Sequence, residues 1–393
     1  MRTHLFAAFV LAAAGPAAAS EESVRLADAF GGGPVLGERT ASGTVGGAAW
    51  RARSLIVGQT STLTLEAGGD PIYLPARPGK NGVVFLELFG TGFCSGSLMA
   101  GGTAILTAAR CVTDRSGAIA ATGGFAYFYP GPADPLYDLG FGVTPGIERV
   151  ALGAIHVAPG YTGQVVDHND LAVIFLAGAA PAFARPYLLE RLVDPRGVAF
   201  NVAGFGDRGR SGATGFLPGT VGRLREGDNR FEFALGDPIF GGGWGGPELL
   251  ARYGDVWLSD FDRVGSADND AACILTGLVF GLGDTFCETG LGPREVGVAP
   301  GDSGGPQFVN GRIVSVSSFI LTFGPDFGDV DDRLNGSWGE FSGFAPVFRN
   351  RSWIERLVPG AFVPEPGTWA MLITGFGLVG LALRRRRGDP AAA

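Results

Sequence analysis

The chain has 393 residues and a formal net charge of −8, with 46% hydrophobic and 17% charged residues. The acidic balance, with no clustered basic face in the body of the chain, argues against nucleic-acid binding because a phosphate backbone would be repelled. The 67 glycines and 25 prolines favour turns and short strands over long helices, and the length allows a large core, so we expect mostly β structure.

The first 20 residues have the pattern of a secretory signal. Arg2 precedes an apolar run from Leu5 to Ala14, and small residues follow at positions 17–20. This run is shorter than the ~20 residues that a membrane-spanning helix needs. We therefore expect residues 1–20 to be removed on export to an oxidising compartment, where the four cysteines can form two disulfides.

Residues 21–80 are rich in Gly, Ala and Thr with weak alternation, and we interpret them as a lead-in or pro-segment. From residue 82 onward, apolar runs separated by Gly and Ser predict the short strands of a β-barrel. These runs lie at residues 83–88, 103–106, 171–176, 198–203 and 312–318. Only residues 351–357 have the apolar spacing of a helix.

The most specific string is GDSGGP at residues 301–306, in which glycines flank Ser303. Such a turn exposes the hydroxyl and presents consecutive N–H groups to a developing oxyanion. Two other stretches precede it: residues 104–112 (AILTAARCV) contain Arg110, and residues 168–174 (HNDLAVI) contain Asp170. Together the three stretches resemble the trypsin-like serine peptidases, in which a base, an acid and a nucleophile follow in this order.

The resemblance extends over about 270 residues and implies an all-β fold of two six-stranded antiparallel β-barrels of the chymotrypsin type, with a C-terminal helix. We assign residues 81–358 to this peptidase domain. The resemblance also implies disulfides Cys94–Cys111 and Cys273–Cys287, and an oxyanion hole formed by the N–H groups of Gly301 and Ser303. It implies catalytic roles at the positions of Ser303, Asp170 and Arg110.

Arg110 stands where the family has its base histidine. A general base needs a pKa near neutrality, whereas a guanidinium stays protonated and offers only donors. Arg110 therefore cannot accept the proton of Ser303, and we expect it to form a salt bridge with Asp170. His168, two residues before Asp170, is the histidine best placed to act as a substitute base, but it would have to shift toward Ser303 to do so.

The resemblance also places the substrate pocket. Gly297 lies at the specificity position six residues before Ser303, Ser318 lies on the substrate-binding strand, and Ile320 replaces a glycine that opens the pocket in many members. These residues predict a shallow apolar pocket. Residues 56–59 (IVGQ) partly match the terminus that activation frees in this family, but an ordinary surface strand is the interpretation that we favour.

The C-terminal region carries Pro364, Glu365 and Pro366, then an uncharged stretch from 370 to 383, then Arg384–Arg387. This order resembles the PEP-CTERM sorting signal of Gram-negative bacteria, and we assign residues 363–387 to it, including a short transmembrane span. The resemblance implies processing by a membrane transpeptidase of the exosortase type, with the arginines on the cytoplasmic side. A plain membrane anchor is the alternative.

Two functions remain open at this stage. The first is an exported serine endopeptidase, impaired at Arg110, that acts on polypeptides. The second is a non-catalytic pseudo-peptidase that serves as a binding protein of the cell envelope or extracellular matrix. We predict no cofactor and no metal, because Arg333 interrupts the acidic cluster of Asp329, Asp331 and Asp332 at calcium-loop spacing.

Overall fold

The structure is a computed structural model of the chain. It describes residues 39–53, 57–59, 70–75, 79–130, 146–166, 168–218, 220–241 and 254–362, together with positions 374, 376 and 378. The predicted signal peptide and the sorting motif at Pro364, Glu365 and Pro366 lie outside the described residues.

The first half of the peptidase domain is a closed antiparallel barrel in the order β4-β5-β6-β9-β8-β7. Its apolar runs form strands that are largely buried, and β4 and β6 are buried at nearly every position, so side chains on both faces of these strands are covered. The strands are β4 (Val83–Leu88), β5 (Gly92–Leu98), β6 (Ala104–Thr107), β7 (Gly124–Phe128), β8 (Glu148–Val157) and β9 (Ala172–Leu176).

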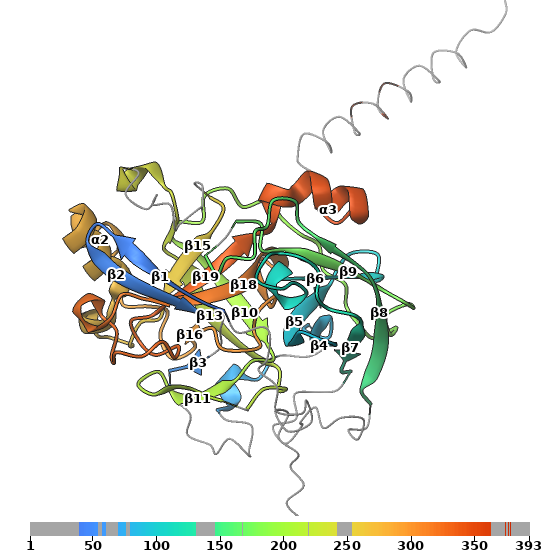
Figure 1. Cartoon of the computed structure of the whole chain (residues 1–393), viewed down its shortest axis with the longest axis horizontal. Coiled ribbons are helices and arrows are strands. Elements are labelled where there is room, and N and C mark those ends of the chain that lie inside the picture. The colour runs from blue at the N-terminus through green and yellow to red at the C-terminus, as the bar shows by residue number, and fades with distance from the viewer. Residues whose placement is uncertain are drawn as a thin grey trace, which may run out of the picture. The chain divides into compact units, whose positions relative to one another are not determined.

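The second half is a sheet whose strand order runs β13-β10-β17-β18-β19-β15-β14 (Figure 1). The strand ladder is not a complete ring: it ends at β13 and β14, two consecutive strands that only Glu232 separates. The Glu232 N–H donates to the Leu258 carbonyl of β15 at 2.9 Å, so the two ends of the path lie together. The strands are β10 (Val198–Gly204), β13 (Arg225–Phe231), β14 (Phe233–Ala234), β15 (Trp257–Asp260), β17 (Pro306–Val309), β18 (Arg312–Thr322) and β19 (Phe341–Pro346).

An N-terminal hairpin extends this second sheet. Strand β1 (Thr40–Val45) and strand β2 (Ala48–Arg53) are joined by Gly46 and Gly47, whose φ angles of 53° and 91° suit a two-residue hairpin turn. Strand β2 pairs antiparallel with β18, with Arg53 opposite Ile320. Figure 1 shows the two blue strands beside the orange β18. Part of the segment interpreted as a lead-in is thus built into the sheet.

The hairpin also contributes side chains to a hydrophobic core. Val45, Ala48, Trp50 and Ala52 are buried in one cluster with residues of the second sheet, including Phe319. Trp50 is only 2% exposed. Because burying a side chain of this size contributes a few kcal/mol to folding, the hairpin is held by packing as well as by strand pairing.

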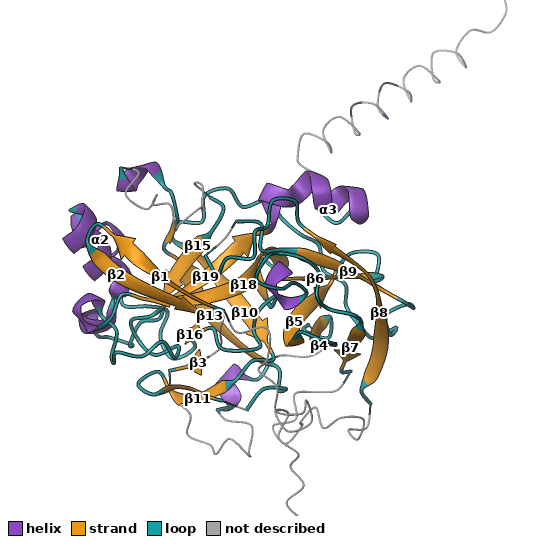
Figure 2. Cartoon of the chain, viewed as in Figure 1, coloured by secondary structure: helices purple, strands orange, loops and turns teal. Residues whose placement is uncertain are grey.

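Helices are few in the part of the chain that the structure describes (Figure 2). The predicted C-terminal helix is α3 (Arg351–Leu357), whereas α2 (Ala271–Phe280) was not predicted, because its sequence is apolar on nearly every side and has no amphipathic period. Asp270 caps α2 at its N-terminus, and Gly281, in the left-handed conformation, ends it.

The remaining elements are short. They comprise strands β3 (Val57–Gly58), β11 (Arg208–Ser211), β12 (Gly215–Leu217) and β16 (Val296–Gly297), and 3-10 turns η1 (Pro71–Tyr73), η2 (Ala109–Cys111), η3 (Pro238–Phe240), η4 (Ala267–Asn269), η5 (Gly283–Phe286), η6 (Pro325–Phe327) and η7 (Val347–Asn350).

Candidate active site

The GDSGGP turn leads directly into β17 and holds Ser303 at 7% exposure. Gly304 has φ of 80°, and a Cβ at this position would lie 2.0 Å from Thr107 Oγ1, so only glycine fits. The Ser303 carbonyl accepts a hydrogen bond of 2.9 Å from the Ser95 N–H, which ties the turn to the first barrel. The N–H groups of Gly301 and Ser303 donate to no described residue, so these two donors are available to an oxyanion.

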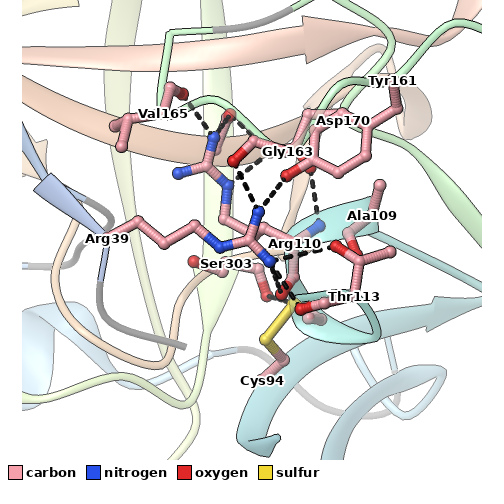
Figure 3. A network of polar contacts seen from close by, with 12 residues as sticks. Arg39, Cys94, Ala109, Arg110, Thr113, Tyr161, Gly163, Val165, Asp170 and Ser303 are labelled. Carbon is pink, nitrogen blue, oxygen red and sulfur yellow. Dashed lines mark hydrogen bonds and ion pairs between the residues drawn. A yellow bond between two sulfur atoms is a disulfide. The ribbon is translucent and has the colours of Figure 1, made fainter. Parts of the chain in front are cut away.

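Arg110 and Asp170 form a buried ion pair. The Arg110 Nε lies 2.5 Å from Asp170 Oδ2, and the Arg110 backbone N–H donates to Asp170 Oδ1 at 2.9 Å (Figure 3). The two side chains are 1% and 0% exposed. Arg110 Nη2 also donates to the Val165 carbonyl at 2.6 Å and to Ser318 Oγ at 2.8 Å, and that hydroxyl in turn donates to Asp170 Oδ2 at 2.7 Å.

The elements explain how these residues meet. Arg110 lies in η2 just after β6, and Asp170 lies just before β9, with which β6 pairs. Cys111, the next residue after Arg110, has its Sγ 3.6 Å from the Ser303 carbonyl oxygen. The base position, the acid and the nucleophile turn therefore belong to one cluster at the junction of the barrel and the second sheet.

No described residue hydrogen-bonds to the Ser303 hydroxyl. Of the two histidines in the described part of the chain, His156 packs its ring edge-on against Phe175. The His168 ring lies beside Gly160: its Nε2 is 3.6 Å from the point where a Cβ on Gly160 would lie. Neither imidazole is within bonding reach of Ser303, so the described residues give this hydroxyl no proton acceptor.

Arg39 is a residue of this cluster that the sequence analysis did not find. It is 2% exposed and donates to the Tyr161 hydroxyl at 2.7 Å and to the Gly163 carbonyl at 2.9 Å. It also donates to the Thr113 carbonyl at 2.5 Å and to the Arg110 carbonyl at 3.3 Å (Figure 3). A lone arginine in a weakly patterned segment carries no periodic signal, so only its position in the fold reveals this role.

The three predicted pocket residues are all buried, and each has its own surroundings. Ser318 belongs to the polar cluster through its bonds to Asp170 and Arg110. Ile320 is 1% exposed and lies opposite Arg53 of the hairpin, and Gly297 lies in β16, where a Cβ would be 3.2 Å from the Phe261 ring.

Strand β18 has one edge that leads past Ser303. Strand β19 pairs with the opposite edge of β18, so β17 and β2 both pair with the edge near Ser303. On this edge, β17 pairs with β18 up to Val316, and β2 pairs with it from Ile320 to Thr322. Between them, the Ser317 carbonyl accepts from the Gly304 N–H at 2.8 Å. The pairing of β2 with β18 thus begins at Ile320, two residues after Ser318. It lies on the edge of β18 to which an extended peptide could add as a strand.

The residues weighed as an activation terminus are partly described. Val57 and Gly58 form β3, which pairs with β16, while Ile56 lies outside the described residues. Asp302, which would receive a freed terminus in this family, is fully buried and accepts hydrogen bonds from the N–H groups of Gly206 at 2.8 Å and Ala299 at 2.9 Å.

Both implied disulfides are present. Cys94 pairs with Cys111, and Cys273 pairs with Cys287, with Cα–Cα distances of 6.1 Å and 4.4 Å. The first bridge ties β5 to η2 and so fixes the segment that carries Arg110. The second ties α2 to the loop that follows it.

The barrel, the second sheet, the glycine-flanked Ser303 and the closing helix together define a chymotrypsin-type serine peptidase fold. Comparison with protein families agrees: the Trypsin family model matches residues 75–328, and the chain belongs to this family. The PEP-CTERM protein-sorting motif matches residues 362–387, which marks the chain as an exported protein of a Gram-negative envelope that undergoes exosortase-type processing. A comparison with curated proteins found no match.

The short transmembrane span predicted near the C-terminus lies almost wholly outside the described residues. No helix among the described residues is long and apolar enough to cross a membrane. Residues 370–383 fall outside the described residues except at positions 374, 376 and 378.

Proposed function

We propose that this exported trypsin-family protein does not hydrolyse peptide bonds at an appreciable rate, because Arg110 occupies the position of the general base. The observation that carries the proposal is the buried ion pair between Arg110 and Asp170. In this pair the carboxylate that should orient an imidazole is fully engaged by a permanent cation. Ser303 keeps its oxyanion donors but has no group that can take its proton.

The expected loss is large. Removing the base of a serine triad costs on the order of 10⁶ in turnover, and what remains comes from binding and from the oxyanion hole. The ion pair itself makes a rearrangement unfavourable, because breaking a buried pair costs about 3–5 kcal/mol. Ser303 therefore stays a weak nucleophile in the native state.

The fold is retained for binding rather than for catalysis. A polypeptide ligand in the cell envelope or extracellular matrix is the partner class that suits a peptidase fold sorted to that location. The N-terminal hairpin acts as a pro-segment within residues 21–80: its β2 strand takes the edge of β18 that an extended peptide would need. A ligand must displace the hairpin or bind elsewhere on the domain.

Processing follows the order of the segments. The signal at residues 1–20 is removed on export, and the peptidase domain of residues 81–358 is the mature functional part. Residues 363–387 hold the chain at the membrane until an exosortase-type enzyme cleaves near Pro364, Glu365 and Pro366. The match of the sorting motif to residues 362–387 supports this last step.

Digestion of fluorescent casein by the purified exported chain tests the proposal. The Ser303→Ala variant is the matched control, since it removes the nucleophile but not the fold. We expect equal, background rates for the two proteins. A rate for the native chain that exceeds the Ser303→Ala background and is lost on inhibition of serine peptidases would refute a disabled site.

A further inference from the structure

Three buried carboxylates converge in the second half of the domain, away from Ser303. Asp260 ends β15, Asp262 follows two residues later, and Asp270 caps α2. One oxygen from each lies within 4.8 Å of the other two, and the residues are only 3%, 2% and 3% exposed. Bringing like charges together out of water is unfavourable unless something neutralises them.

No described residue neutralises the three carboxylates. None of these three carboxylates forms an ion pair with a described residue. Asp260 Oδ2 and Asp270 Oδ1 each accept one backbone N–H at the start of α2, from Ala272 at 2.7 Å and from Cys273 at 2.8 Å. Asp262 Oδ1, by contrast, is buried and accepts no hydrogen bond from the described residues, so one oxygen of the cluster has no protein partner.

The surroundings add more negative charge. Glu295 lies beside Asp262 and accepts its backbone N–H at 2.7 Å, and Glu232 is buried nearby. Arg230 pairs with the neighbouring Glu288 at 2.5 Å. The cluster therefore lies in a buried region of negative charge, which favours a bound cation.

The donor chemistry selects the kind of cation. All the available ligands are oxygens; Cys273 and Cys287 are joined in a disulfide, so neither offers a thiolate. Oxygen donors suit hard cations, and a dry, irregular cage suits calcium better than magnesium, which keeps several of its waters and demands octahedral geometry. An exported protein also meets calcium at concentrations that weak extracellular sites use.

We propose that Asp260, Asp262 and Asp270 bind one calcium ion. The ion joins the end of β15 to the start of α2, and the loop between them carries Phe261, whose ring packs against Gly297. It is a structural ion whose ligands are not part of the Arg110 cluster, and this inference does not depend on the proposed function.

The test is calcium titration of the exported chain after removal of divalent ions with a chelator. We expect calorimetry to show one site, and addition of about 10 mM calcium chloride to raise the melting temperature by about 5 °C. The Asp262→Asn variant should lose this rise. Without calcium it should melt at or above the native chain, because one repelling charge has been removed.

Asp268→Asn is the matched control, since Asp268 is exposed on the same loop. This variant should keep the full response to calcium. The proposal is overturned if calcium neither binds nor shifts the melting temperature of the native chain, if magnesium alone does so, or if Asp262→Asn responds to calcium as the native chain does.

Discussion

Replacing Arg110 with histidine is the change that should restore chemistry to Ser303. The backbone bond from residue 110 to Asp170 Oδ1 (2.9 Å) does not depend on the side chain, so the carboxylate stays in place. An imidazole can donate to Asp170 Oδ2 in place of the guanidinium Nε. The contact from Arg110 Nη2 to the Val165 carbonyl (2.6 Å) is lost, which costs about 1–3 kcal/mol of stability for an unsatisfied buried acceptor.

The expected gain in hydrolysis rate is large enough to measure even if the variant is less stable. A positioned general base contributes roughly 10²–10⁴-fold, so Arg110→His should raise hydrolysis of a small acyl ester such as p-nitrophenyl acetate at least 100-fold over the native chain. A small ester is chosen because it does not need the β18 edge that the hairpin covers. Adding Ser303→Ala to this variant should abolish the gain, and Arg110→Gln should show none.

The result that would refute the reasoning is specific. If Arg110→His folds with nearly native stability, as judged by circular dichroism and thermal melting, yet shows no hydrolysis that depends on Ser303, then the missing base is not what limits the site. The cause would then lie in the geometry of the turn or of the oxyanion donors.

Three further predictions concern stability and access. Arg110→Met should lower the free energy of unfolding by about 3–5 kcal/mol in urea titrations, since it leaves Asp170 buried and unpaired; no loss would show that the pair is not essential. Burial, and then repulsion from Asp329, raises the pKa of Glu340 from 4.5 to about 8. The contribution of Glu340 to the free energy of unfolding is therefore fully present below pH about 4.5 and is lost as the pH rises through about 8. Glu340→Gln should therefore flatten the fall in melting temperature over that range, and an unchanged pH profile would contradict this. Ala52→Pro should break strand pairing in the hairpin and make the segment near Arg53 sensitive to added trypsin in the otherwise folded chain; equal resistance to cleavage would show that the hairpin is not docked as described.

The three motifs that meet around Arg110 are visible in the sequence because each of them is compact. Spacing within GDSGGP and within the stretches around Arg110 and Asp170 is local, and local spacing is what a sequence displays. The salt bridge expected between Arg110 and Asp170 is present at 2.5 Å. It follows from chemistry alone, because a buried carboxylate next to a buried guanidinium has no better partner.

Other features depend on contacts between distant segments. Arg39 lies 71 residues before Arg110, and β2 pairs with a strand about 270 residues further along the chain, so no periodicity could reveal either contact. Helix α2 was missed because an apolar helix has no amphipathic pattern. The carboxylates of Asp260, Asp262 and Asp270 look like ordinary loop residues until the fold buries them together.

The incomplete ring of the second sheet has a similar explanation. The resemblance implied two closed six-stranded barrels, and the first is closed as expected. In the second, the path runs from β13 to β14, two strands separated by Glu232 alone, and the hairpin of residues 40–53 adds strands that the six-stranded pattern does not contain. Neither the break at Glu232 nor the pairing of the hairpin falls within the motifs that identify the family.

The most direct test of a missing proton acceptor is the rate at which a fluorophosphonate modifies Ser303, measured by the mass of the intact chain. Since only an activated serine reacts quickly, the native chain should remain unmodified under conditions that fully modify an active trypsin-type enzyme. Rapid, stoichiometric addition at Ser303, absent from the Ser303→Ala variant, would show that the hydroxyl is activated despite Arg110 and would contradict the account.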